Sequence, residues 1–411
     1  MKYLVIIPDG IGDHPSEALG DKTPLEVARI PNLNFFAQIG KVGTVKTVPD
    51  RMEPAAHVAF SSLLGFDPKQ YPMGPGPLEA ANLEVKLEDN EIAFQMNFVT
   101  ESEGILADAR GGCISTREAK AFIAFLNKKL ASDFVRFFSS SGYRHIAVIK
   151  DARGYEALSA HCSEPEAVVG KRIEDHLPKG PGEDLIKKLM YDSKLLLQDH
   201  EINQVRIDLG ENPANMIWLY GQGSAPKLPK FSERFNGLTG ATISRSEAVK
   251  GFSRLIGLTV VELPSTHAYP DFDYEGEAQA MLELVGEKDF VCVHARACEE
   301  ASREGDIKQK TLSLEAIDHH LIGAARSLYE SQKDVRVLIC PLHNTPTHLR
   351  AHARESVPFI LSGKNVMPDG IERFNEATAQ LSHLRLREGW KLIDHLIGGK
   401  ELAEREAVLK S

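Results

Sequence analysis

The feature that most constrains this chain is the alternation of short apolar runs with amphipathic segments of helical period. The first run, Lys2–Pro8, ends in a turn at Asp9. Thr23-Pro24-Leu25-Glu26 then combines a capping-box pattern with proline at the first helical position, which predicts a helix to about Gly40. The apolar run Val42–Val48 follows as a second strand. Strand, helix and strand in this order are typical of a parallel sheet with helices on both faces.

The C-terminal half repeats this alternation, and the middle of the chain departs from it. The later predicted strands are Leu258–Leu263, Phe290–Ala295, Val335–Cys340 and Pro358–Leu361. A long helix, Ser313–Gln332, is predicted between the second and the third of them. In the middle, the strand Glu91–Thr100 is followed by amphipathic helices. We therefore expect an α/β protein with a doubly wound core formed by residues 1–85 and 213–411. A smaller α+β domain, 86–212, is expected to be inserted in it.

Composition excludes several classes of protein. A length of 411 residues exceeds what one compact core normally contains. The net charge of -10 argues against a nucleic-acid partner, because a phosphate backbone requires a basic face. The apolar run at the N-terminus is too short for a signal or membrane segment. We expect a cytoplasmic protein that binds neither nucleic acid nor membrane.

Polar side chains follow several of the predicted strands, where ligands bind in doubly wound sheets. Asp9 follows the first strand, Glu299 follows the Phe290 strand, and His343 and His352 follow the Val335 strand. Carboxylates together with imidazoles suit Zn²⁺ or Mn²⁺. Spacing alone leaves plainer alternatives open, because aspartate is also an ordinary turn residue and a buried histidine can bind a backbone carbonyl.

A family resemblance extends over nearly the whole chain. The stretches that carry it, in order, are LVIIPDGIGDHP, GDKTPLEVARIPNLNFFAQIGKVGTVKTVPD, SSLLGFDP, GPLEAANLEV, CISTREA, HLPKGPG, GENPANMIWLYGQG, DYEGEA, REGD and SVPFILSG. They resemble archaeal-type 2,3-bisphosphoglycerate-independent phosphoglycerate mutases. The resemblance implies an alkaline-phosphatase-like core with an inserted smaller domain. It also implies conversion of 3-phosphoglycerate to 2-phosphoglycerate through a phosphoserine and two divalent metals.

The serine nucleophile of that family has no counterpart here. Its motif, roughly Pro-Gly-Ser-Asp-Val-Ala, corresponds to PAAHVA at residues 54–59, and the following LGFDP fixes the register without a gap. Ala56 therefore stands at the nucleophile position, and a methyl group cannot attack phosphorus. The catalytic residue is left unknown. His57, the next residue, is the candidate to accept a phosphoryl group instead.

The metal ligands implied by the resemblance survive only in part. Asp9, His343 and His352 are retained, and Glu299 is a longer substitute for an aspartate. Arg303 replaces a histidine ligand and Leu342 replaces an aspartate ligand. We therefore predict a weak or vestigial metal site, with no resident cofactor or at most one weakly bound Mn²⁺ or Zn²⁺.

The substrate-binding side is reduced in the same way. Arg110 and Arg144 match arginines of the family, whereas Gln95 and Glu277 replace basic residues. A lost arginine removes a bidentate partner for phosphate or carboxylate. A small phosphorylated or carboxylate ligand is the expected partner, and the oligomeric state stays open.

Three hypotheses about function follow. The main one is a phosphoglycerate mutase-family protein of glycolytic ancestry that has lost the mutase activity, a pseudoenzyme. The first alternative is an enzyme with altered phosphoryl-transfer or acid–base chemistry in the same pocket. The second alternative is an active cofactor-independent phosphoglycerate mutase. A related subgroup is associated with homoserine kinase or phosphonopyruvate decarboxylase activity, and the sequence does not separate these labels.

Overall fold

The computed structural model describes residues 1–151, 156–263 and 269–399, and the chain divides into two compact units. The first unit contains Met1–Tyr71 and Leu228–Ser411, and the second contains Pro72–Lys227. The segment 86–212, expected as an inserted domain, lies inside the second unit. That unit also includes helix α4 (Pro75–Asn82) and strand β7 (Met216–Ser224), because both pack on its central strand β3.

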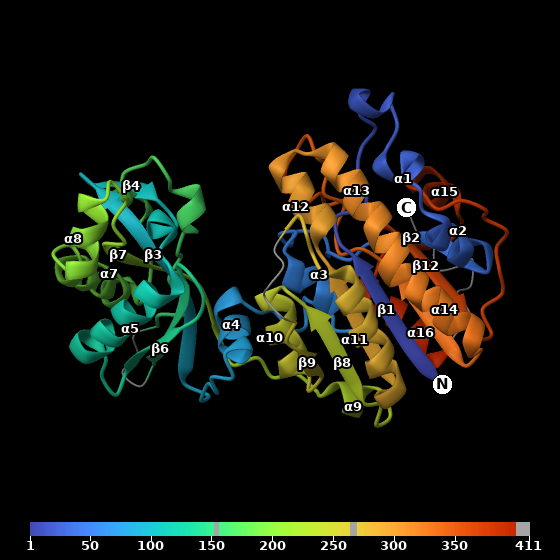
Figure 1. The fold of residues 1–411 in the computed structure, drawn as a ribbon. Helices are drawn as coiled ribbons and strands as arrows, with labels where there is room; N and C mark the ends of the chain where they lie inside the picture. The colour runs from blue at the N-terminus through green and yellow to red at the C-terminus, as the bar shows by residue number, and fades with distance from the viewer. Residues whose placement is uncertain (152–155, 264–268, 400–411) are drawn as a thin grey trace. The chain divides into compact units, whose positions relative to one another are not determined.

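An eight-stranded sheet forms the centre of the first unit (Figure 1). In spatial order its strands are β13 (Arg385–Leu386), β2 (Gly40–Val45), β12 (Val357–Gly363), β11 (Val335–Ile339), β1 (Lys2–Pro8), β10 (Phe290–Ala295), β8 (Gly240–Ser244) and β9 (Thr259–Val261). The five strands from β11 to β9 are parallel, whereas β12 runs antiparallel to both of its neighbours. Strands β10 and β11 are buried along their whole length, as expected for a sheet covered on both faces.

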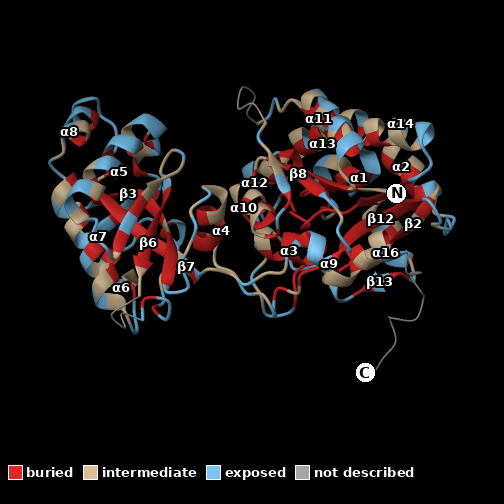
Figure 2. Ribbon diagram, turned by 90° about the horizontal axis from the view of Figure 1, so that it is seen from below, coloured by how far each residue is buried: buried red, intermediate tan, exposed pale blue. Residues whose placement is uncertain are grey.

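Helices cover both faces of this sheet (Figure 2). One face carries α2 (Pro31–Gln38), α11 (Tyr274–Glu287), α13 (Ile307–Ile317) and α14 (Gly323–Ser331). The other face carries α3 (Ala56–Leu63), α10 (Glu247–Leu255) and α16 (Leu392–Gly398). On the second face, Phe252 makes edge-to-face contacts with Phe60 and Phe66. The predicted doubly wound α/β core is confirmed.

The prediction of one continuous helix from Thr23 to Gly40 is wrong, because this segment forms two helices. Its capping box is present at Thr23 and Glu26, but helix α1 (Pro24–Val27) ends before Pro31, where α2 begins. Proline has no N–H and disfavours helical backbone in the residue before it. The later helix was predicted to begin at Ser313 but begins at Ile307, and a π-helical turn, Asp318–Ile322, separates α13 from α14.

The second unit has its own sheet and its own core. Its strands are β3 (Glu91–Ser102), β4 (Ile105–Asp108), β5 (Val135–Ser139), β6 (Arg144–Lys150) and β7, with β3 paired to β4, β6 and β7. Helices α5 (Thr116–Leu130), α7 (Glu183–Leu197) and α8 (Glu201–Asp208) pack with it. Across the described ranges of the chain, no helix is long and apolar enough to cross a membrane.

A buried lysine joins three segments at the carboxyl end of the first unit's sheet. Lys310 on α13 is fully buried, and its ammonium donates to Asp13 Oδ2 at 2.7 Å, Gly12 O at 3.1 Å and Thr345 O at 3.0 Å. These acceptors use all three of its N–H donors. Burial lowers the pKa of Lys310, and the Asp13 carboxylate opposes that shift. The loops that follow β1 and β11 are therefore held against α13.

Replacement of Lys310 by Met leaves the Asp13 carboxylate buried without its cation. We expect Lys310→Met to lower the free energy of unfolding by about 3–5 kcal/mol, measured by urea unfolding. Lys308→Met, on the exposed side of the same helix, is the matched control and should change it by less than about 0.5 kcal/mol. Equal unfolding midpoints for the two variants would contradict a stabilising role for the buried lysine.

Candidate functional site

The carboxyl ends of three neighbouring strands bring together the residues predicted as metal ligands. Strand β1 pairs with β10 on one side and with β11 on the other. Asp9 follows β1, Glu299 lies on α12 (Ala297–Glu304) after β10, and His343 follows β11. His352 lies farther along the segment after β11 and contacts Glu299. The strand-end rule thus placed these four side chains in one cluster.

Asp9 is the most enclosed member of the cluster. Its side chain is fully buried, and Oδ1 accepts from the backbone N–H groups of Gly10, Leu342 and His343 at 3.0, 3.1 and 3.2 Å. Its Oδ2 lies 3.3 Å from His294 Nε2. Burial raises the pKa of Asp9, but the hydrogen bond from His294 and the other favourable interactions outweigh it, so that the net shift is downward. Asp9 is therefore an anion that joins three strand ends.

Glu299 is surrounded by positive groups. Its Oε1 accepts from Arg303 Nε at 3.0 Å and lies 2.8 Å from His352 Nε2, and its Oε2 accepts from Arg296 Nε at 3.1 Å. Burial alone would raise the pKa of Glu299. The hydrogen bond to His352 and the two guanidinium groups outweigh burial and hold that pKa well below its usual range. Arg303, which the resemblance puts at a lost ligand position, thus provides a fixed cation beside this carboxylate.

The two histidines of the cluster differ in their surroundings. Their rings stack with centroids 4.0 Å apart and an interplanar angle of 7°. His352 donates from Nδ1 to the carbonyl of Pro54 at 2.8 Å. Burial lowers the pKa of His352, but the hydrogen bond to Glu299 and the negative charges of Asp9 and Glu299 together outweigh burial and raise that pKa. His343 is buried, neither of its ring nitrogens has a hydrogen-bond partner among the described residues, and burial lowers its pKa to about 3.

The position that the resemblance assigns to the nucleophile lies beside this cluster. Ala56 is the first residue of α3, two residues after the Pro54 carbonyl that binds His352. His57 is the next residue of α3 and is half-buried. Leu342 is buried, and only its backbone N–H reaches Asp9. The side chains at positions 56 and 342 therefore bring no donor atom to the site.

In the second unit, the two predicted substrate-binding arginines share one aromatic ring. The guanidinium carbons of Arg110 and Arg144 lie 6.0 and 5.3 Å from the centroid of the Tyr143 ring. Both arginines are exposed. Two exposed guanidinium groups at one half-buried ring are a suitable arrangement for an anionic ligand.

Sequence reasoning missed three residues of the cluster: Ser244, His294 and Arg296. His294 lies in the buried strand β10 and was counted with the apolar run FVCVHA. One signal in the sequence could have identified it: His294 is a polar residue next to the end of an otherwise apolar strand, where ligand-binding side chains are expected. Ser244 looks like an ordinary residue at a strand end, and only the sheet order brings it to His294, which contacts Asp9. Arg296 is three residues before Glu299 at the start of α12, so its ion pair with Glu299 is local.

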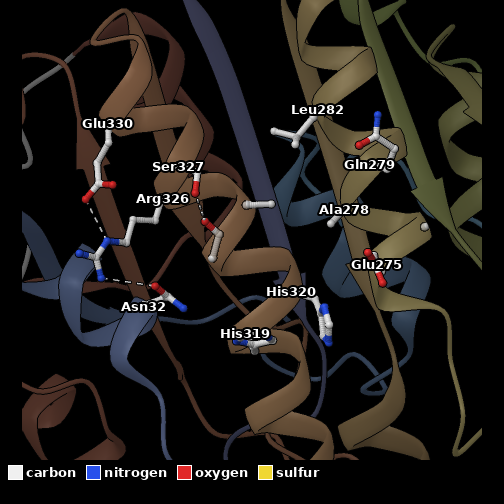
Figure 3. Close-up of a pocket in the computed structure, with 13 residues that line it drawn as sticks. Asn32, Glu275, Ala278, Gln279, Leu282, His319, His320, Arg326, Ser327 and Glu330 are labelled. Carbon is white, nitrogen blue, oxygen red and sulfur yellow. Dashed lines mark hydrogen bonds and ion pairs between the residues drawn. The ribbon is translucent and has the colours of Figure 1, made fainter.

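A separate hollow lies between α11 and α14 (Figure 3). It has a volume of about 710 Å³ and is lined by His319 and His320 of the π-helical turn, by Glu275 of α11 and by Arg326 of α14, among others. Arg326 donates to Glu330, as Figure 3 shows. None of the residues predicted for the site lines this hollow.

Comparison with known proteins identifies the family. A family model described as 2,3-bisphosphoglycerate-independent phosphoglycerate mutase matches residues 37–203. The protein of that name from Methanothrix thermoacetophila is 39% identical over 400 residues, covering 97% of this chain and 100% of the relative. The chain belongs to the 2,3-bisphosphoglycerate-independent phosphoglycerate mutase family.

Two solved structures share the fold of this chain. A protein from Pyrococcus horikoshii superposes with a TM-score of 0.79 at 23% identity, covering 97% of this chain and 98% of its own. The cofactor-independent phosphoglycerate mutase from Thermoplasma acidophilum superposes with a TM-score of 0.67 at 25% identity, covering 98% and 100%. The expected fold, a doubly wound α/β core with a smaller α+β part, is confirmed.

Membership in this family overturns the expectation of no resident cofactor. The family reaction depends on divalent metal, so a divalent metal is the expected cofactor here. The carboxylate of Asp9 and the ring nitrogens of His343 are metal-ligand types. Glu299 and His352 are engaged by Arg303, and within the described ranges no three His, Cys, Asp or Glu residues converge on one point. The described residues therefore form a complete site neither for one divalent cation nor for a metal pair.

The ionised state of Glu299 should make the free energy of unfolding depend on pH. Because its pKa in the folded protein lies below the unfolded value of about 4.3, its contribution is fully present above that pH and is lost as the pH falls below it. We expect Glu299→Gln to lower the free energy of unfolding by about 3 kcal/mol at pH 7, with the difference from wild type shrinking below pH ~4. Urea unfolding over a pH series measures this.

Glu300→Gln is the matched control for this substitution. Glu300 binds Arg296 at 2.9 Å but is partly exposed, so its removal should cost less than about 1 kcal/mol. A difference between Glu299→Gln and wild type that stays constant down to pH 3 would show that the carboxylate is not held ionised by its neighbours.

Proposed function

We propose that this chain is a phosphoglycerate mutase-family protein that no longer runs the mutase reaction through a phosphoserine. The observation that carries the proposal is Ala56 at the start of α3, where the resemblance puts the nucleophile. Its methyl group has no lone pair with which to attack phosphorus. Arg303 and Leu342 support the same conclusion, since neither can bind a divalent metal.

The retained role in this proposal is binding of a small phosphorylated carboxylate, with 3-phosphoglycerate as the first candidate. The pair of arginines at Tyr143 supports an anionic ligand. The positive side chains at the ends of the first unit's strands, Arg296 and Arg303, support it as well. The same proposal includes a cytoplasmic location and a link to glycolysis, because phosphoglycerate is an intermediate of glycolysis.

An active phosphoglycerate mutase is the second candidate, and the comparisons favour it over loss of activity. The relatives that match over their full length are named as mutases. This candidate needs another residue to carry the phosphoryl group. His57, beside residue 56, is the candidate for that role, and Glu299, His343 and His352 would supply acid–base groups.

An enolase-coupled assay with 3-phosphoglycerate separates the two candidates. With Mn²⁺, and separately with Zn²⁺, the purified full chain is expected to show no turnover above the enzyme-free background. The variant Ala56→Ser/His57→Asp/Arg303→His/Leu342→Asp restores the family residues and should regain turnover together with bound metal, measured by metal analysis after dialysis. Turnover by the wild-type chain would reject the proposal in favour of the active mutase.

The matched control keeps Ala56 and carries the other three substitutions. It should bind metal as the fourfold variant does but show no turnover, because only the nucleophile is missing. Binding of 3-phosphoglycerate to the wild-type chain, measured by calorimetry, tests the ligand independently of turnover. Arg144→Ala should weaken that binding about tenfold, as expected for loss of a charge-assisted hydrogen bond.

A further inference from the structure

The hollow between α11 and α14 lies apart from the strand-end cluster and has the size of a small-molecule site. Its volume of about 710 Å³ is within the range of ligand pockets in proteins, roughly 300–1,000 Å³. Ala278 and Leu282 of α11 line one side, and Gly323 and Ala324 of α14 line the other. These small or aliphatic side chains leave the space between the two helices open (Figure 3).

The π-helical turn at the start of α14 fixes two polar side chains at this hollow. Asp318, the first residue of the turn, is buried, and its carboxylate accepts from the backbone N–H groups of Asn32 and Leu33 at 3.1 and 2.7 Å. The next two residues, His319 and His320, line the hollow, and their rings meet edge to face with centroids 4.7 Å apart. Because α2 holds the turn through Asp318, both imidazoles are in place without a ligand. Such π-helical turns are frequent at functional sites.

Most polar side chains at the hollow have partners within the protein. The side chains of Arg326, Asn32, Gln279 and Ser327 each donate a hydrogen bond within the first unit. Glu330 accepts the bond from Arg326 at 3.0 Å. The ionisable lining side chains that have no hydrogen bond or ion pair with any residue the structure describes are Glu275, His319 and His320. These groups are therefore available to a ligand.

The available groups require a ligand with two kinds of charge. Glu275 belongs to α11 and brings a carboxylate, which accepts hydrogen bonds and favours a cation. His319 and His320 belong to the facing segment, and each imidazole has an N–H donor in either protonation state, which favours an anion. A molecule with an ammonium and a carboxylate satisfies both sides. The apolar surface of Leu282 and Ala324 between them suits an aliphatic group.

We propose that this hollow binds a free α-amino acid with an aliphatic side chain. Its ammonium pairs with Glu275, its carboxylate accepts from His319 and His320, and its side chain lies against Leu282 and Ala324. The proposal goes beyond the proposed function and does not rest on it, because none of the strand-end residues lines the hollow.

Titration calorimetry of the full chain with L-leucine, without phosphoglycerate, tests the class of ligand. L-Leucine is expected to bind. Isopentylamine, which lacks the carboxylate, and 4-methylpentanoate, which lacks the ammonium, should each bind at least about tenfold more weakly, because each loses a charge-assisted contact. No binding of L-leucine, or equal affinity for either analogue, overturns the proposal.

Substitutions test whether the amino acid binds at this hollow. Glu275→Gln, which removes the charge, and Ala324→Met, which fills the space, should each weaken L-leucine binding at least about tenfold. Glu275 is exposed, so Glu275→Gln should keep the wild-type midpoint of urea unfolding, and its lost affinity then reports the site and not the fold. Glu287→Gln, at an exposed glutamate that ends α11, is the matched control and should bind as wild type. Wild-type affinity in both Glu275→Gln and Ala324→Met overturns the assignment.

Discussion

The buried carboxylate of Asp9 is the interaction on which the arrangement of the site depends. A charge withdrawn from water is costly unless hydrogen bonds replace its hydration. Here those bonds come from the loop after β11, from β10 and from the turn after β1, so satisfying the anion also aligns three strand ends. Gly10 allows the turn after β1 to lie directly against the backbone of Glu299. A Cβ at this position would lie 2.6 Å from the Glu299 backbone, and its φ of +75° favours glycine.

Beside this anion, fixed cations surround the second buried carboxylate of the cluster, Glu299. Glu299 has two guanidinium groups and an imidazole as neighbours, all supplied by the chain itself. Such pairs lower the pKa of the carboxylate as a metal would, but they leave it no open coordination position. His343 differs, because its buried ring has no hydrogen-bond partner in the described part of the chain. The two carboxylates of the cluster are thus both satisfied by internal partners, whereas this imidazole is not.

Much of this architecture could be predicted, because it depends on periodicity and on the parallel sheet. Apolar runs with helical segments between them fixed the α/β class, and the strand-end rule placed Asp9, Glu299 and His343 together. The pairing of Arg303 with Glu299 follows from a separation of four residues on one helix. The contact of Arg303 with His352 could not be predicted in this way, because it depends on the path of the segment after β11. His294 was missed because a buried histidine in an apolar strand has the same pattern as a core residue.

The boundaries of the second unit, Pro72 and Lys227, determine whether it can be produced separately. Its first long strand, β3, pairs antiparallel with its last strand, β7, and Ile92 lies opposite Ser224. The start of the unit is also close to its end, because a Cβ at Gly74 would lie 2.4 Å from the carbonyl oxygen of Gln222. Its sheet and hydrophobic core are complete without residues from the other unit. The segment 72–227 is thus suited to expression as an independent domain, and a short linker could join the two flanking parts of the core in its place.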